Sequence, residues 1–143
     1  MILCDTSTAA KLYVPERETA PVRHLLEAQD EVCASELARV ELMGVFHRRL
    51  REGKWSRADF LAVVRQFSHD DIGGFWTRLP LTAALVEAAA TIYATLPETV
   101  FLRSADCQHL VTAVHYNFGE LRCDREGYSA ELRRSGSRSA GHR

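Results

Sequence analysis

Four acidic residues stand at positions where a carboxylate could do chemistry. Asp5 follows a short apolar run and Asp124 follows a short strand-like segment, so each is predicted at the end of a strand. Glu41 and Asp106 are predicted on the inward stripes of two helices. Four carboxylates in one pocket would need a cation, and a site with only oxygen ligands favours Mg²⁺ or Mn²⁺. Because such a site is suited to phosphodiester hydrolysis, the pattern indicates a nucleic acid as substrate.

Each acid also has a purely structural interpretation. Asp5 could cap the following helix, and for that residue alone we favour capping by roughly two to one. Glu41 could form a buried salt bridge with Arg48, and Asp106 could stabilise a helix N-terminus as a first-turn acid. Asp124 could form a surface ion pair with a neighbouring Arg. Two strand ends and two inward helix positions together nevertheless favour one shared pocket.

Short strands alternate with helices along the predicted chain. We expect strands at residues 2–4, 31–34, within 75–81 and at 120–123. Helices are expected over a brief segment before residue 15 and over residues 18–28 and 36–51. A further helix should begin at residue 56 and end at a loop at 70–74. The last helices are expected from 83 to about 96 and over 104–117, with a weak one at the end of the domain. Ser35, Thr82 and Ser104 are the expected N-caps of three of them. This alternation predicts an α/β fold with a short parallel sheet flanked by helices on both sides.

Length and composition place limits on the class of protein. The chain has 143 residues, of which 46% are hydrophobic, enough for one domain with its own core. We assign this domain to residues 1–131, and residues 132–143, with four Arg and no acid, to a disordered basic tail. Neither a membrane span nor a signal peptide is predicted, so we expect a cytoplasmic protein. The four cysteines are scattered and predict buried, reduced side chains rather than a zinc site.

The helix predicted at 36–51 carries a second apolar stripe made of Leu42, Met43, Phe46 and Leu50. Either the next helix covers this stripe in an αα-hairpin, or part of it forms a groove for a partner helix. We rate the two about even. A basic cluster lies near the end of the helix and could contact RNA phosphates or simply be solvated: Arg48, Arg49, Arg51, Lys54 and Arg57.

The four acids lie in motifs that resemble those of the PIN-domain ribonucleases, specifically the VapC-type toxins of toxin–antitoxin pairs. The motifs are MILCDTS at Asp5, SELARVEL at Glu41, LRSADCQHLVTA at Asp106 and CDR at Asp124. The resemblance implies a PIN fold, Mg²⁺- or Mn²⁺-dependent endonucleolytic cleavage of RNA, an antitoxin partner and a homodimer. Asp5 and Asp106 would be the metal ligands, and Glu41 and Asp124 further catalytic acids.

The same resemblance places a hydroxyl residue at Ser7 and the motif's usual histidine at His109, where a helix-face histidine is more often structural than catalytic. The last motif departs from the family pattern, because Arg122 stands where a Thr is usual. A PIN-like module that binds RNA or protein without cleavage is therefore the alternative prediction. An aspartyl phosphatase is a weaker rival, because Asp5 is followed by Thr-Ser rather than by a D-x-D pattern.

Overall fold

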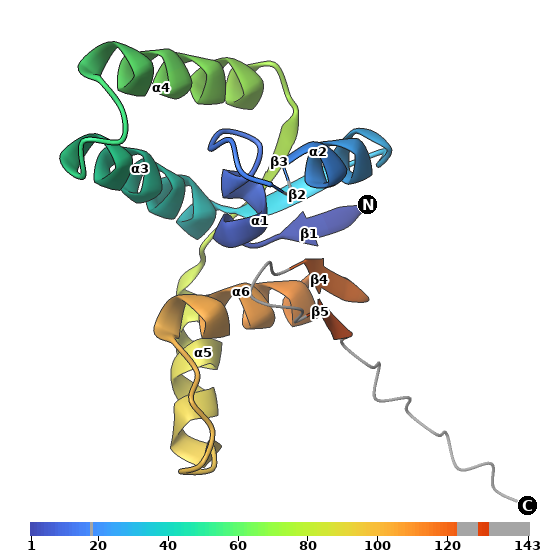
Figure 1. The fold of residues 1–143 in the computed structure, drawn as a ribbon. Helices are drawn as coiled ribbons and strands as arrows, with labels where there is room; N and C mark the ends of the chain where they lie inside the picture. The colour runs from blue at the N-terminus through green and yellow to red at the C-terminus, as the bar shows by residue number, and fades with distance from the viewer. Residues whose placement is uncertain (18, 123–128, 132–143) are drawn as a thin grey trace, which may run out of the picture.

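The centre of the molecule is one mixed β-sheet, seen in a computed structural model that describes residues 1–17, 19–122 and 129–131. Within these residues five strands lie in the order β3-β2-β1-β4-β5 (Figure 1). The first four strands are mutually parallel, and β5 runs antiparallel to β4. The strand bounds are β1 Ile2–Cys4, β2 Val32–Ser35, β3 Trp76–Leu79, β4 Glu120–Arg122 and β5 Ser129–Glu131.

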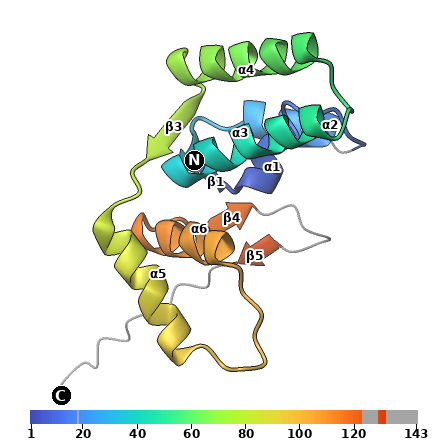
Figure 2. The ribbon, with the colours of Figure 1, turned by 90° about the vertical axis from the view of Figure 1, so that its left-hand side faces the viewer.

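Helices cover both faces of this sheet. Helices α1 to α4 lie on one side, and α5 and α6 lie on the other (Figures 1 and 2). Their bounds are α1 Thr6–Ala10, α2 Thr19–Glu27, α3 Glu36–Arg51, α4 Arg57–Ile72, α5 Ala83–Thr95 and α6 Ser104–His115. The predicted α/β class, with a short parallel sheet between two helical layers, is confirmed.

Side-chain caps define where most of these helices begin. Asp5, Ser35, Ser56 and Thr82 each accept a hydrogen bond from a backbone N–H in the first turn of the helix that follows. These bonds satisfy donors that have no partner inside the helix. Ser104 was the wrong choice of cap, because it is already helical and Arg103 holds the N-cap position without a side-chain bond.

Two other sequence-based assignments were wrong. The expected loop at 70–74 begins too early, because α4 continues to Ile72 and ends at Gly73. The expected weak last helix is contradicted at Ser129–Glu131, which pairs with β4 as a strand. Residues 129–131 form a strand because they hydrogen-bond to β4, and this pairing cannot be seen in the local sequence pattern.

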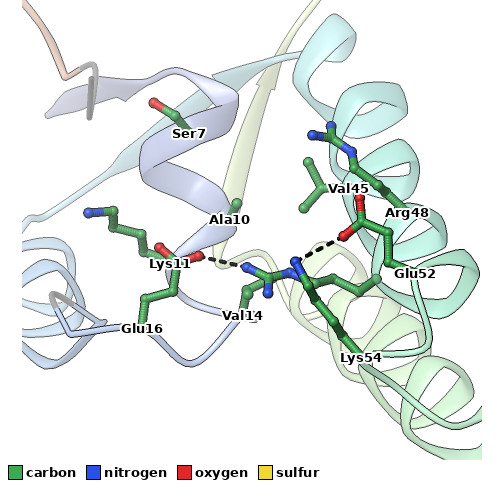
Figure 3. Close-up of a pocket in the computed structure, with 10 residues that line it drawn as sticks. Ser7, Ala10, Lys11, Val14, Glu16, Val45, Arg48, Glu52 and Lys54 are labelled. Carbon is green, nitrogen blue, oxygen red and sulfur yellow. Dashed lines mark hydrogen bonds and ion pairs between the residues drawn. The ribbon is translucent and has the colours of Figure 1, made fainter. Parts of the chain in front are cut away.

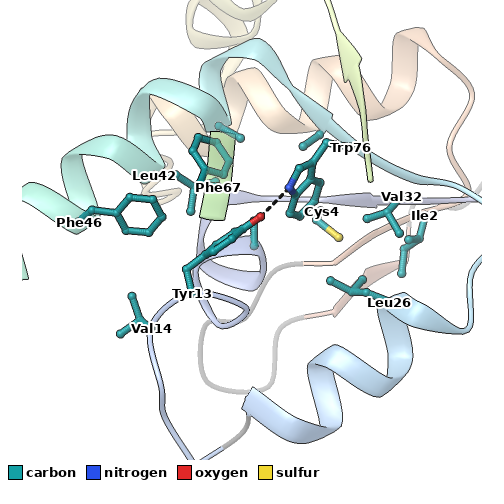
Figure 4. Close-up of a cluster of buried hydrophobic side chains, with 13 residues drawn as sticks. Ile2, Cys4, Tyr13, Val14, Leu26, Val32, Leu42, Phe46, Phe67 and Trp76 are labelled. Atoms are coloured by element: carbon teal, nitrogen blue, oxygen red, sulfur yellow. Dashed lines mark hydrogen bonds between the residues drawn. The ribbon is translucent and has the colours of Figure 1, made fainter. Parts of the chain in front are cut away.

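Alternating strand residues supply two separate cores, because successive side chains point to opposite faces of a sheet. On one face Ile2, Cys4, Val32 and Ala34 pack beneath α1 to α4 (Figure 4). On the other face Leu3 and Cys33 join a cluster with residues of α6 and β4. The three cysteines that the structure describes, Cys4, Cys33 and Cys107, are all buried, as predicted.

The second apolar stripe of α3 lies in the first core. Leu42 and Phe46 are completely buried, and the Phe46 ring packs edge-on against Phe67 of α4 and Tyr13, with ring centroids 5.8 and 5.6 Å away. The αα-hairpin alternative is therefore correct for these residues. A partner-helix groove at Leu42 and Phe46 is excluded, whereas Met43 and Leu50 of the same stripe are only partly buried.

Two further predictions concern membrane-spanning helices and the C-terminal tail. Among the described helices, none combines the length and apolar character needed to cross a membrane. The tail predicted at 132–143 lies outside the described residues.

Candidate functional site

A pocket of about 410 Å³ lies beside the carboxyl end of β1, between the start of α1, the middle of α3 and the start of α6. Asp5, Glu41 and Asp106 all line it. The structure therefore brings together three of the four acids singled out from the sequence. The fourth, Asp124, lies outside the described residues. The other lining residues are Thr6, Ser7, Gly44, Val45, Arg48 and His109.

Asp5 both caps a helix and lines the pocket. Its Oδ1 accepts the backbone N–H of Thr8 at 2.9 Å, the hydrogen bond of an N-cap. The Ser7 hydroxyl donates to both carboxylate oxygens, at 2.8 and 2.7 Å. The residue is only 6% exposed, so these bonds fix a carboxylate that has little contact with solvent. The capping interpretation is confirmed, and it does not compete with a role in the pocket.

Glu41 reaches the same pocket from α3. The face of α3 that carries Glu41, Leu37 and Val45 is only partly buried and borders the pocket, whereas the fully buried face carries Ala38, Leu42 and Phe46. Glu41 is therefore not aimed into the apolar core. It lies at the boundary between core and pocket, where a carboxylate can meet both protein donors and solvent.

One oxygen of the Glu41 carboxylate is held by two side chains from other helices. The hydroxyl of Thr6 on α1 donates to Oε2, and Nε2 of His109 on α6 lies 2.9 Å from the same oxygen. An ionised carboxylate only accepts hydrogen bonds, so the imidazole must donate from Nε2 in this contact. These bonds tie α1, α3 and α6 together at the pocket wall.

His109 is itself held from behind. Its Nδ1 lies 3.2 Å from the Ser35 hydroxyl, and the imidazole is 97% buried between this contact and Glu41. Ser35 also caps α3, accepting the N–H of Ala38 at 3.3 Å. A histidine at this depth supports the site from within the protein, in line with the structural role expected for a helix-face histidine.

Asp106 lies in the first turn of α6, one turn before His109, so both residues face the pocket. Asp106 is partly buried and lines the pocket, whereas Cys107, Gln108 and His109 beside it are fully buried, so the carboxylate faces the pocket rather than the interior. The sequence did not indicate Thr6 or Ser35 as part of the site. The available signals were that Thr6 directly follows Asp5 and that Ser35 ends a strand at the same sheet edge.

The donor set fits a hard divalent cation. The acids offer oxygen atoms only, as Mg²⁺ and Mn²⁺ prefer. Across the described residues no three Asp, Glu, His or Cys side chains form a ready-made cage. Mg²⁺ does not require such a cage, because it usually keeps several waters and takes one or two carboxylates plus substrate phosphate.

A basic groove of about 350 Å³ adjoins the acidic pocket, and the two share Ser7, Val45 and Arg48 (Figure 3). Within this groove Arg49 pairs with Glu16 at 2.8 Å, and Lys54 pairs with Glu52 at 3.0 Å. Arg48 is exposed at the boundary between the two. Positive charge thus lies beside the carboxylates, and anions could be held there without entering the acidic pocket.

Comparison with known proteins identifies consistent relatives. A family model described as PIN domain matches residues 2–131. The chain is 38% identical over 117 residues to Ribonuclease VapC47 of Mycobacterium tuberculosis (strain CDC 1551 / Oshkosh), a match that covers 79% of this chain and 74% of the relative. The crystal structure of M. tuberculosis VapC20, titled a sarcin-ricin loop cleaving toxin, superposes with a TM-score of 0.67 at 15% identity, covering 85% of this chain and 87% of that one.

Proposed function

We propose that this chain, which belongs to the PIN-domain family and is of the VapC type, is a divalent-metal-dependent endoribonuclease and the toxin of a toxin–antitoxin pair. The observation that carries the proposal is the convergence of Asp5, Glu41 and Asp106 on one pocket beside the carboxyl end of β1. The similarity to Ribonuclease VapC47 supports RNA as the substrate class.

Asp5 and Asp106 are the proposed ligands of Mg²⁺ or Mn²⁺, with Glu41 as a further acid of the site. A bound ion would supply an activated water and neutralise charge on the scissile phosphate. Asp5 is oriented by Ser7 and the Thr8 N–H, so its carboxylate is in place before a ligand arrives. Such preorganisation lowers the cost of ordering the site during the reaction.

Asp124 remains a proposed fourth acid. Its support comes from the strand before it, because the backbone register pairs Arg122 with Cys4 in parallel strands. The strand that precedes Asp124 therefore ends at the same sheet edge as the strand that precedes Asp5. Carboxyl ends of neighbouring parallel strands are where sites form in α/β sheets.

The proposed path of the RNA backbone runs along the basic groove toward the acids. Arg48 lines both hollows, and Lys11, Arg49 and Lys54 line the groove alone. Cations in such a groove would attract phosphates and set the position of the strand, without reading its sequence. Two of these cations already face acidic partners, so we assign Arg48 the main part in phosphate contact.

The proposal includes a protein partner as well as RNA. An antitoxin that blocks the pocket is the proposed partner on the basis of the VapC-type relatives. A second copy of this chain is proposed only because the motifs resemble those of a family whose members are usually homodimers. A cytoplasmic location remains part of the same proposal. The antitoxin would restrain the nuclease until the pair separates.

The proposal is tested by metal titration. Isothermal calorimetry with MnCl₂ should show binding to the wild-type chain and strongly weakened binding to Asp106→Asn, which removes one charge with little change in shape. RNA cleavage should stop in EDTA and return with Mg²⁺ or Mn²⁺. If the folded wild-type chain binds no divalent ion at millimolar concentrations, the nuclease proposal fails and the non-cleaving binding module becomes the better account.

A further inference from the structure

We infer that His109 is a positioning residue for Glu41 and that Ser35 holds His109 in place. Together His109 and Ser35 set the affinity of the acidic pocket for its divalent ion. The inference rests on the proposed function and deepens it. It adds two residues without a carboxylate, His109 and Ser35, which hold the acid Glu41 in place.

Burial determines what His109 can do. Its side chain is 3% exposed, so it cannot meet an RNA strand directly. Its Nε2 meets Glu41 Oε2 at 2.9 Å, and its Nδ1 meets the Ser35 hydroxyl at 3.2 Å. With both ring nitrogens engaged, the imidazole plane cannot rotate without losing a buried hydrogen bond, which is unfavourable because the buried group is then left without a partner.

The consequence for Glu41 is a fixed carboxylate. Thr6 and His109 approach the same oxygen from α1 and α6, whereas Glu41 itself stands on α3. A flexible glutamate side chain is thereby kept in one orientation at the pocket wall. Glu41 would then contribute to holding the ion beside Asp5 and Asp106, and residues that orient an acid which holds a metal typically change metal affinity or activity by about 10–100-fold when they are removed.

Ser35 allows the contact that holds His109 in place to be removed without changing His109 itself. It caps α3 and also contacts His109, so Ser35→Ala removes a cap and a positioning contact together. Ser56 caps α4 through Asp59 N–H at 3.1 Å and lines neither the acidic pocket nor the basic groove. Ser56→Ala is therefore a matched control that removes a cap alone.

The experiment measures the Mn²⁺ dissociation constant by calorimetry for the wild type, His109→Ala, His109→Gln, Ser35→Ala and Ser56→Ala. We expect His109→Ala to weaken Mn²⁺ binding about 10–100-fold. His109→Gln, whose amide can donate to Glu41 from nearly the same place, should recover most of that loss. Ser35→Ala should weaken Mn²⁺ binding, and Ser56→Ala should leave it unchanged, even though both variants lose a side-chain cap of a helix.

Thermal unfolding identifies any variant that fails to fold. If His109→Ala does not fold, the comparison of Ser35→Ala with Ser56→Ala still tests the positioning role. Both serine variants lose a helix cap, but only Ser35→Ala loses a contact with His109. If folded His109→Ala, or Ser35→Ala, binds Mn²⁺ as tightly as the wild type, the positioning role is overturned and the nuclease proposal stands. Absence of Mn²⁺ binding by the wild type would overturn both.

Discussion

At the scale of single residues, the acidic pocket shows that a structural role and a chemical role can share one side chain. Asp5 starts α1 as an N-cap and also lines the pocket. Its cap bond uses one oxygen, and Ser7 contacts both. The Asp5 carboxylate therefore accepts a backbone N–H of the helix that follows it and still lines the pocket.

Tyr13 offers a residue-scale test of buried polar bonding in the larger core. Its hydroxyl donates to Asp70 at 2.8 Å and accepts from Trp76 Nε1 at 2.9 Å (Figure 4), and burial raises the pKa of Tyr13 above its usual range. Tyr13→Phe leaves the buried indole N–H without this partner, so it should lower the free energy of unfolding by about 1–3 kcal/mol.

Urea denaturation of this variant measures the effect, with Tyr93→Phe as the control. Tyr93 is exposed, and its hydroxyl donates to the Leu102 carbonyl at 2.9 Å, where water can replace it. The control should change stability by less than about 0.5 kcal/mol. Equal effects in the two variants would contradict the importance that we give to the buried pair.

At the scale of elements, helix α3 connects the core to the pocket. Phe46 is completely buried among the rings of Tyr13, Trp55 and Phe67, with centroids 5.6 to 6.0 Å away. Phe46→Ala should destabilise the fold by about 3–5 kcal/mol, because it removes apolar contacts and leaves a cavity.

Val40 on the same helix is 70% exposed, so Val40→Ala should change stability by less than about 0.5 kcal/mol. Chemical denaturation of both variants at low temperature gives the comparison. A loss at Phe46 as small as the loss at Val40 would show that α3 is not anchored through this ring.

The elements also show what the sequence could and could not predict. Hydrophobic periodicity predicted the strands and the main helices, because those patterns are local. The contacts of His109 were not predictable in this way, since they join residues 68 and 74 positions apart. Periodicity also misjudged the fully buried face of α3, which depends on how α1 and α4 pack against it.

At the scale of the whole molecule, charge is arranged unevenly despite a net charge of −1. Carboxylates converge on one pocket while Arg48, Arg49 and Lys54 line the groove beside it. Arg48→Ala should weaken binding of single-stranded RNA. It should also reduce the slope of log affinity against log salt concentration by about 0.7, the change expected for one lost phosphate contact.

Fluorescence anisotropy over a salt series measures this slope, in EDTA so that the RNA remains intact. Arg65→Ala is the control, because Arg65 is exposed on α4 and lines neither the groove nor the pocket. If both variants lower the slope equally, the cations act through general attraction and the groove has no special part.

The most direct test of the central claim is cleavage of RNA by Asp5→Asn in the presence of Mn²⁺, with stability measured on the same sample. Asparagine caps a helix about as well as aspartate, so the fold should be retained. The lost charge should nevertheless reduce cleavage by more than about 100-fold, beyond the loss typical of residues that only support a metal ligand. Wild-type cleavage by this variant would contradict the account and leave Asp5 as a helix cap alone.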